Sequence, residues 1–242
     1  MNLESRVALV TGAGRRIGRA LAVALGGEKM RVAVHHNSSA TDAAQTVEMI
    51  VAAGGTATVF QADLTGNSAP DALVAAVVAE MGSLDVVINS AAVMQKTPVG
   101  EVTVQEWDAM FALNLRAPFF IAQAAAKAMA EEGSIVNIAD LAAFETWPAY
   151  IPHAISKAGV VKMTESLARA LAPRVRVNCI APGAVLLPDD WDDDTALRFA
   201  ATTPLKKLGD PSDVVAAMLY FLRADYVTGE TLVVDGGRRI RK

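Results

Sequence analysis

Residues 6–18 read RVALVTGAGRRIG, and this stretch determines the fold class. It joins a short apolar strand to the start of a helix through a turn that contains Gly12, Gly14 and Gly18. Glycines in such a turn let the backbone approach a pyrophosphate and leave N–H groups at the helix N-terminus free to bind it. The spacing departs from the dinucleotide fingerprint G-x-G-x-x-G, because three residues separate Gly14 from Gly18. The place of the turn, after the first strand and before the first helix, still favours a nucleotide site over a merely tight corner.

Strand-like and helix-like segments alternate along the rest of the chain. The first four strand segments are apolar throughout, as in a parallel sheet with helices on both faces. This alternation predicts an α/β fold, a doubly wound parallel sheet. We expect strands at 6–11, 31–35, 56–62, 84–89, 134–139, 175–180 and 231–234, and helices at about 17–25, 41–53, 71–81 and 110–130.

One region, about 184–205, is irregular and is predicted to be a loop that acts as a substrate lid. Five aspartates lie between positions 189 and 194 in this region. They would repel an anionic substrate if they face the pocket, and a solvated loop face is the alternative.

The composition excludes several classes of protein. A chain with 52% hydrophobic and 20% charged residues is not disordered. Its net charge of −4 and the lack of a basic block give no footprint for nucleic acid. The single cysteine, Cys179, excludes an intrachain disulfide and, with three histidines, a structural zinc site. No apolar run approaches the roughly 20 residues that span a bilayer, and the first ten residues do not resemble a signal peptide. We therefore expect a soluble, cytoplasmic protein without a bound metal.

The end of the second strand indicates which nucleotide binds. NAD enzymes place an acid there to accept from the ribose 2′-hydroxyl. Here residues 35–39 read HHNSS, and no acid follows until Asp42. Arg15 and Arg16 lie in the turn that would face the same ribose, where a 2′-phosphate needs cations and donors, although two solvated surface arginines are the alternative. We therefore expect NADP(H), with His36, Asn37 and Ser38 at the phosphate.

Polar residues also follow the later strands. Residues 89–92 (NSAA) close the fourth strand, Asp140 closes the fifth, and Asn114 lies inside a helical stretch. Ser156 and Lys157 open the next helix, shortly after His153. Each could have an ordinary role as a cap, a helix kink or a surface side chain. Together they predict a titratable cluster at the mouth of the sheet.

This ordered set of motifs resembles the short-chain dehydrogenase/reductase family over nearly the whole chain. The resemblance implies one Rossmann-type domain over 1–242, usually tetrameric, that passes a hydride between a nicotinamide and a small alcohol or carbonyl. It places Asp63 and Asn89 near adenine and ribose, Lys157 on the nicotinamide ribose, and a proton-relay water on Asn114. The expected cofactor set is Gly12, Gly14, Arg15, Arg16, Ile17, Gly18, His36, Asn37, Ser38, Asp63, Leu64, Asn89, Ser90, Ala91, Lys157, Pro182, Gly183 and Val185.

Within that family the chain is most similar to the pteridine reductases, which also carry an arginine at the position of Arg16 and an aspartate at that of Asp140. The family's catalytic tyrosine precedes the lysine by four residues, and His153 stands there in this chain. Two further departures are Met94, where pteridine reductases carry an aromatic residue, and Leu187, where many members carry threonine. The predicted substrate contacts are Met94, Trp147 and Trp191.

A histidine could carry the proton, because an imidazole titrates close to working pH. The cation of Lys157 disfavours imidazolium, whereas Asp140 would stabilise it. We therefore expect an NADP(H)-dependent oxidoreductase for a small carbonyl, alcohol or pterin-like substrate, with Asn114, Asp140, His153 and Lys157 as its catalytic residues. A non-catalytic NADP(H)-binding sensor and a reductase that uses Tyr150 remain as alternatives. Small apolar residues on helices 114–130 and 154–172 predict a homotetramer or dimer.

Overall fold

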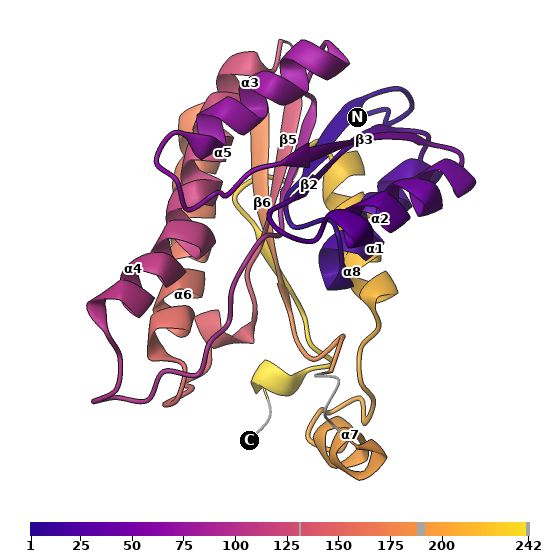
Figure 1. Cartoon of the computed structure of the whole chain (residues 1–242). Helices are drawn as coiled ribbons and strands as arrows, with labels where there is room; N and C mark the ends of the chain where they lie inside the picture. Colours follow the sequence, from indigo (N-terminus) through magenta and orange to yellow (C-terminus); the bar gives the residue numbers. More distant parts are fainter. Residues whose placement is uncertain (131, 188–191, 241–242) are drawn as a thin grey trace.

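Seven parallel strands form one sheet, in the order β3-β2-β1-β4-β5-β6-β7, in the computed structural model, which describes residues 1–130, 132–187 and 192–240 (Figure 1). Because β1 pairs with both β2 and β4, the chain winds outward from β1 in both directions. In such sheets a crevice opens at the carboxyl ends of the strands, where the winding reverses. The strands are β1 (Val7–Val10), β2 (Arg31–His36), β3 (Thr56–Gln61), β4 (Val86–Asn89), β5 (Gly133–Ile138), β6 (Val175–Pro182) and β7 (Thr231–Val234).

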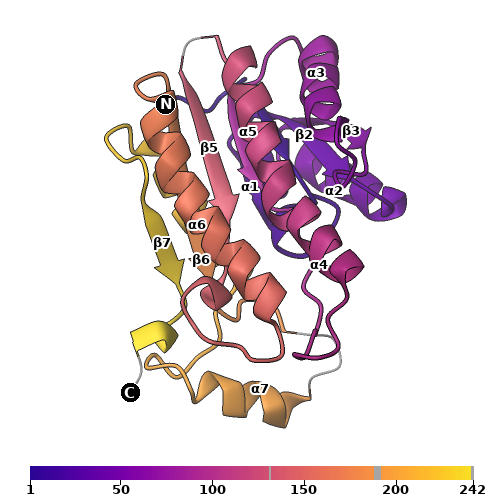
Figure 2. The ribbon, with the colours of Figure 1, turned by 90° about the vertical axis from the view of Figure 1, so that its left-hand side faces the viewer.

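Helices cover both faces of the sheet, which confirms the predicted doubly wound α/β fold. One face carries α1 (Arg16–Gly27), α2 (Ala40–Ala52) and α8 (Pro211–Arg223) (Figure 1). The other carries α3 (Ala69–Met81), α4 (Val104–Phe111), α5 (Ala117–Ala128) and α6 (Ile151–Leu171), which stand in front of the sheet in Figure 2. A further helix, α7 (Asp193–Ala200), lies beyond the ends of β6 and β7.

The central strands are apolar because both of their faces are buried. Val7 and Leu9 of β1 pack with the α3–α5–α6 layer. Their neighbours Ala8 and Val10 pack on the opposite face with α1 and α8. Successive side chains of a strand point to opposite faces, so a strand between two helical layers needs apolar residues at every position.

The prediction that the first four strands are all doubly buried is wrong for β3. This strand is at the edge of the sheet, and Thr56 and Val59 are exposed. Its sequence, TATVFQ, contains two threonines and ends in a polar residue, which fits a half-covered edge strand.

The helix expected at 110–130 is divided into three parts. After α4 comes a π-helical turn, η1 (Ala112–Arg116), and only then α5. A π-turn inserts one extra residue into a helix and often occurs at functional sites. Asn114 lies in this turn.

Two further predictions need correction. The region 184–205 is not loop alone, because it contains α7. Helix α6 begins at Ile151, so His153 is in its first turn and Ser156 and Lys157 follow in the second, whereas the sequence had suggested a start at Ser156.

The helical segment Val104–Ala128 is long and apolar enough to cross a membrane by length and composition, which the sequence reading had not singled out. Half of its most apolar window is buried inside the fold. Ala117, Ile121 and Ala125 of this segment belong to the core beneath the sheet. Burial of this kind is typical of the core helix of a globular domain.

Candidate active site

A cleft of about 540 Å³ opens at the carboxyl ends of β1, β2, β4 and β5. It contains the glycine-rich turn at one end and the Asp140–His153 pair at the other. The predicted site residues that line it are Gly12, Gly14, Arg15, Arg16, Ile17, Gly18, His36, Asn37, Ser38, Asp63, Leu64, Ser90, Ala91, Met94, Asp140, His153, Lys157, Pro182 and Gly183.

The turn after β1 needs its glycines because neighbouring backbone leaves no room for side chains. Gly12 has φ +65°, and a Cβ there would lie 2.9 Å from Cα of Ala91. A Cβ on Gly18 would lie 2.2 Å from the carbonyl oxygen of Gly12. The Thr11 hydroxyl holds the far side, since it accepts hydrogen bonds from the backbone N–H groups of Ser90 and Ala91, both at 3.0 Å. The turn is thus a close-fitting backbone cradle between β1 and β4.

His35 holds this turn from below, a role that the sequence reading missed. Its buried ring accepts a hydrogen bond from the Gly12 N–H at Nδ1 (3.1 Å) and donates one from Nε2 to the Ala62 carbonyl (3.0 Å). This pairing requires a neutral ring. Burial lowers the pKa of His35 to about 4, against the hydrogen bond to Ala62, with a smaller lowering from the neighbouring charge of His36. The apolar strand RVAV before it was the available signal, because it places His35 inside the sheet.

Cationic and polar side chains lie together in the corner of the cleft beside the glycine-rich turn. His36 is buried, and its Nδ1 has no hydrogen-bond partner among the described residues. Arg15 and Arg16 are exposed at the same corner. Arg16 has φ +53° and donates from Nη2 to the carbonyl of Leu186 at 3.1 Å. The corner can therefore receive an anion.

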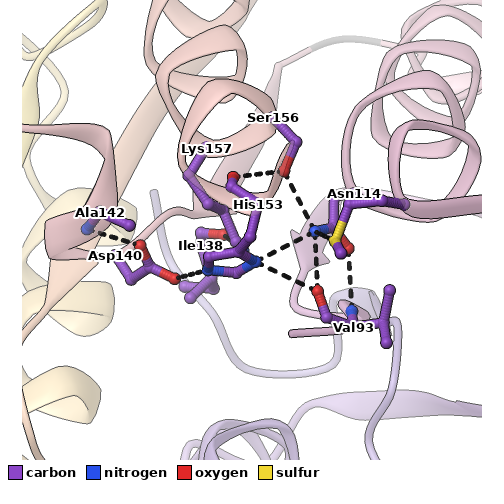
Figure 3. Close-up of polar contacts among 9 residues, drawn as sticks. Val93, Asn114, Ile138, Asp140, Ala142, His153, Ser156 and Lys157 are labelled. Atoms are coloured by element: carbon purple, nitrogen blue, oxygen red, sulfur yellow. Dashed lines mark hydrogen bonds and ion pairs between the residues drawn. The ribbon is translucent and has the colours of Figure 1, made fainter. Parts of the chain in front are cut away.

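At the other end of the cleft, Asp140 and His153 form a short, largely buried pair (Figure 3). Nε2 of His153 lies 2.6 Å from Oδ2 of Asp140. The other carboxylate oxygen, Oδ1, accepts from the N–H of Ala142 at 2.9 Å, so Asp140 caps the short helical turn after β5. Burial opposes ionisation of Asp140, but the bond from His153 and the charge of Lys157 outweigh it and lower its pKa below the ordinary value.

The hydrogen bonds of Asn114 decide whether the second ring nitrogen of His153 donates or accepts. Its Oδ1 accepts from the Val93 N–H (2.8 Å), which fixes the orientation of the amide. Its two amide hydrogens have their nearest oxygen acceptors in the Val93 carbonyl (2.9 Å) and the Ser156 hydroxyl (3.1 Å). The Ser156 hydroxyl uses its own hydrogen on the carbonyl of His153 at 2.7 Å, so it must accept from Asn114.

No amide hydrogen then remains for Nδ1 of His153, which lies 3.5 Å from the Asn114 nitrogen and 3.2 Å from the Val93 carbonyl (Figure 3). Nδ1 must therefore be the donor to Val93. Because a second proton is needed in the 2.6 Å contact with Asp140, the pair holds an imidazolium against a carboxylate, or the same proton shared between them.

Lys157 lies one helical turn after His153 on α6 and is buried. Its Nζ donates to the carbonyl of Ile138 at 2.9 Å. Burial lowers the pKa of Lys157, while the nearby Asp140 and Cys179 act in the opposite direction. Lys157 thus places its amino group in the cleft wall, near Asp140.

Several predicted residues do not line the cleft. Asn89 points into the core, where its amide donates to Oδ1 of Asn137 at 2.9 Å. Asn114 lies behind His153, and Val185 lines a separate, smaller cavity. Trp147 packs edge-on against Tyr150, and neither is in the cleft wall. Trp191 falls outside the described residues, as do two of the five aspartates of its region.

Comparisons with known proteins match this chain to reductases. A family model described as enoyl-(acyl carrier protein) reductase matches residues 12–239. The chain is 35% identical over 244 residues to the 3-oxoacyl-[acyl-carrier-protein] reductase of Synechocystis sp., which covers 97% of both chains.

Solved structures agree. FolM alternative dihydrofolate reductase 1 from Brucella canis, complexed with NADP, superposes with a TM-score of 0.93 at 31% identity, over 100% of this chain and 96% of that one. The angucycline C-6 ketoreductase LanV with bound NADP gives a TM-score of 0.91 at 29% identity, over 99% and 98%.

Proposed function

Because the chain belongs to the short-chain dehydrogenase/reductase family, we propose that it is an NADP(H)-dependent oxidoreductase acting on a small carbonyl, alcohol or pterin-like substrate. One observation carries the proposal: the Asp140–His153 pair and the glycine-rich turn open onto the same cleft. A proton-holding pair next to a nucleotide cradle is what reduction of a carbonyl requires.

The residues present fit an NADP cofactor. Gly12 and Gly18 leave space for a backbone-bound pyrophosphate, because a side chain at either position would collide with neighbouring backbone. The unpartnered Nδ1 of His36, with Arg15, Arg16 and Ser38, suits a 2′-phosphate. Asp63, Leu64, Ser90 and Ala91 would hold the adenosine half, and Lys157 the nicotinamide ribose. When bound, the cofactor supplies or accepts the hydride. The NADP complexes of FolM and LanV support this choice of cofactor.

The substrate would enter beside Asp140 and His153, with Met94 at the outer wall. Met94 is 55% exposed, so an apolar ring could cover it. A pterin-like substrate draws support from Asp140, from the arginine at position 16 and from the likeness to FolM. In this proposal His153 stands at the position of the family's tyrosine, and Asn114 orients it.

The cofactor preference is tested by titration. NADPH should bind at least tenfold more tightly than NADH, a difference of about 1.4 kcal/mol, because residues 35–39 at this corner contain no acid for a 2′-hydroxyl. Replacing Arg15 and Arg16 with Ala should reduce this preference. Equal affinities for the two cofactors in the unaltered protein would contradict the assignment of the corner.

The activity is tested by NADPH oxidation with a panel of carbonyls, quinones and dihydropterins. Turnover of any of these removes the alternative of a non-catalytic sensor, whereas tight NADPH binding without turnover across the panel supports the sensor. Tyr150→Phe is the matched control, because the ring at 150 lies outside the cleft wall and its loss should leave the rate unchanged.

A homotetramer or dimer and a cytoplasmic location are part of the same proposal. Phe119 of α5 and Ile155 of α6 are exposed on the face that family members use for assembly. Light scattering at micromolar concentration tests the assembly, and a monomer mass would refute it.

A further inference from the structure

We propose that Asp140, and not His153, hands the proton to the substrate, and that His153 is a buried positioning residue that stores this proton. The inference rests on the proposed function and assigns the two roles within its site. In this assignment the proton donor lies at the end of β5, whereas in the expected arrangement the side chain at position 153 on α6 is the donor.

Exposure separates the two members of the pair. The His153 side chain is 2% exposed, and the Asp140 side chain is 24% exposed. A group that gives a proton to substrate must come within hydrogen-bond reach of it. Both residues line the cleft, but Asp140 offers far more accessible surface for that approach.

The hydrogen bonds of His153 lead to the same assignment. Nδ1 donates to the Val93 carbonyl, and Nε2 faces Oδ2 of Asp140 at 2.6 Å (Figure 3). An imidazole has only these two nitrogens, so none remains for the substrate. By contrast, the carboxylate of Asp140 can accept further bonds, because among the described residues each of its oxygens has a single partner.

The proton can then be followed through one turnover. The substrate's carbonyl carbon gains a hydride, and its oxygen gains a proton from the carboxyl group of Asp140. This proton comes from His153: its Nε2–H bond breaks, the proton passes to the carboxylate of Asp140, and the carboxyl group so formed releases it to the substrate oxygen. The products are the alcohol, a carboxylate at Asp140 and a neutral imidazole that keeps its Nδ1–H on Val93. Solvent returns the missing proton to the pair through the partly exposed carboxylate of Asp140.

The charges around Asp140 and His153 favour a pair that holds the shared proton before the substrate binds. Asp140 meets His153 and Lys157, both from α6, and the N–H of Ala142 from the turn after β5. Cys179 on β6 faces Lys157 and stays a thiol, because burial raises its pKa to about 11. Asn114 and Val93 contribute uncharged groups only.

The first test needs no substrate. In cofactor-free protein at pH 7, ¹⁵N NMR should show the ring of His153 with protons on both nitrogens. Asp140→Asn should leave that ring singly protonated. A singly protonated His153 in the unaltered protein would overturn the proposal, whatever the enzyme turns over.

The second test compares rates on the panel compound that the unaltered enzyme reduces fastest. Asp140→Asn should lower turnover about 10²–10⁴-fold at every pH. His153→Gln keeps the cleft-facing carboxyl, so its turnover should exceed that of Asp140→Asn. Its turnover should also rise as the pH falls, because loss of the bond from His153 removes a cause that lowers the pKa of Asp140 and leaves burial opposing ionisation. If His153→Gln is the slower variant at pH 5, or if acid does not raise its rate, His153 is the direct donor. If the unaltered enzyme reduces nothing, the proposed function fails, and the NMR result alone decides where the proton is held.

Discussion

The buried ring of His35 predicts that this protein loses stability in mild acid. An unfolded imidazole titrates near pH 6.5. In the folded protein the pKa of His35 is lowered to about 4, and Nδ1 must stay unprotonated to accept from Gly12. The unfolded chain therefore binds more protons between these two values, so stability falls as the pH falls. The contribution is fully present above pH 6.5 and is lost on approaching pH 4.

Its size follows from the two pKa values. Each pH unit within this window costs about 1.4 kcal/mol. Between pH 7 and pH 4.5 the loss due to His35 amounts to about 2 kcal/mol. Carboxylates with lowered pKa, such as Asp140, also lose stability in acid, so the unaltered protein must be compared with a variant.

Urea unfolding of the unaltered protein, His35→Gln and His35→Leu provides the comparison. A glutamine does not titrate but can still accept from Gly12 and donate to Ala62. The advantage of the unaltered protein over this variant should shrink by about 2 kcal/mol on going from pH 7 to pH 4.5. A leucine leaves both backbone groups unpaired and should cost about 2 kcal/mol at pH 7 already. If the unaltered protein and His35→Gln lose stability in parallel, the ring titrates normally and the assigned hydrogen bonds are wrong.

Two other predictions concern the turn and the cysteine. Gly18→Ala should weaken NADPH binding tenfold or more, because its Cβ would lie 2.2 Å from the carbonyl oxygen of Gly12. Gly27→Ala is the control, because no described residue lies within 4 Å of the new Cβ, and equal affinities of the two variants would contradict the geometry of the turn. Cys179 should not react with Ellman's reagent at pH 8 in the native protein, because burial raises its pKa to about 11, and it should react quickly once urea unfolds the chain; rapid native labelling would show that this strand opens.

Local sequence predicted the central sheet well, for a physical reason. Strands buried on both faces must be apolar at every position, and that pattern marked β1, β2 and β4. It could not separate the edge strand β3 from the others, because exposure of an edge depends on which strand pairs beside it. The π-turn η1 was equally hidden, since an extra residue in an apolar helix leaves the composition unchanged.

Two helices were readable but were not predicted. At α8, Asp210 and Asp213 form a capping box around Pro211 at the first helical position. At α7, Asp192 accepts from the N–H of Thr195, so one of the aspartates read as a charged loop is a helix cap. In both cases cap chemistry gave a signal, and at α8 the apolar residues Val214, Ala217, Met218, Phe221 and Leu222 also recur at helical spacing.

The sequence could predict which residues lie near the site, because parallel strands end at one edge of the sheet. It could not predict which way their side chains point. Asn89 follows an apolar strand as the cofactor residues do. It points sideways to Asn137, its partner in register on β5. Successive strand residues face opposite sides, so a difference of one position separates a cleft residue from a core residue.

The roles of Asp140 and His153 also could not be predicted from the sequence, because they depend on how far each side chain reaches. Their positions, at the end of β5 and in the first turn of α6, predict that they meet, and they do. Which of them reaches the substrate depends on where the imidazole and the carboxylate lie in the cleft. The imidazole reaches the cleft wall but is only 2% exposed and is held by Val93, whereas the carboxylate of Asp140 is 24% exposed. A tyrosine on α6 would extend farther than this ring, and a serine at the strand end would be shorter than this carboxylate. In our assignment the exchange of side-chain lengths moves the donor from the helix to the strand end without any change in the backbone, and that is why the motif spacing alone could not reveal it.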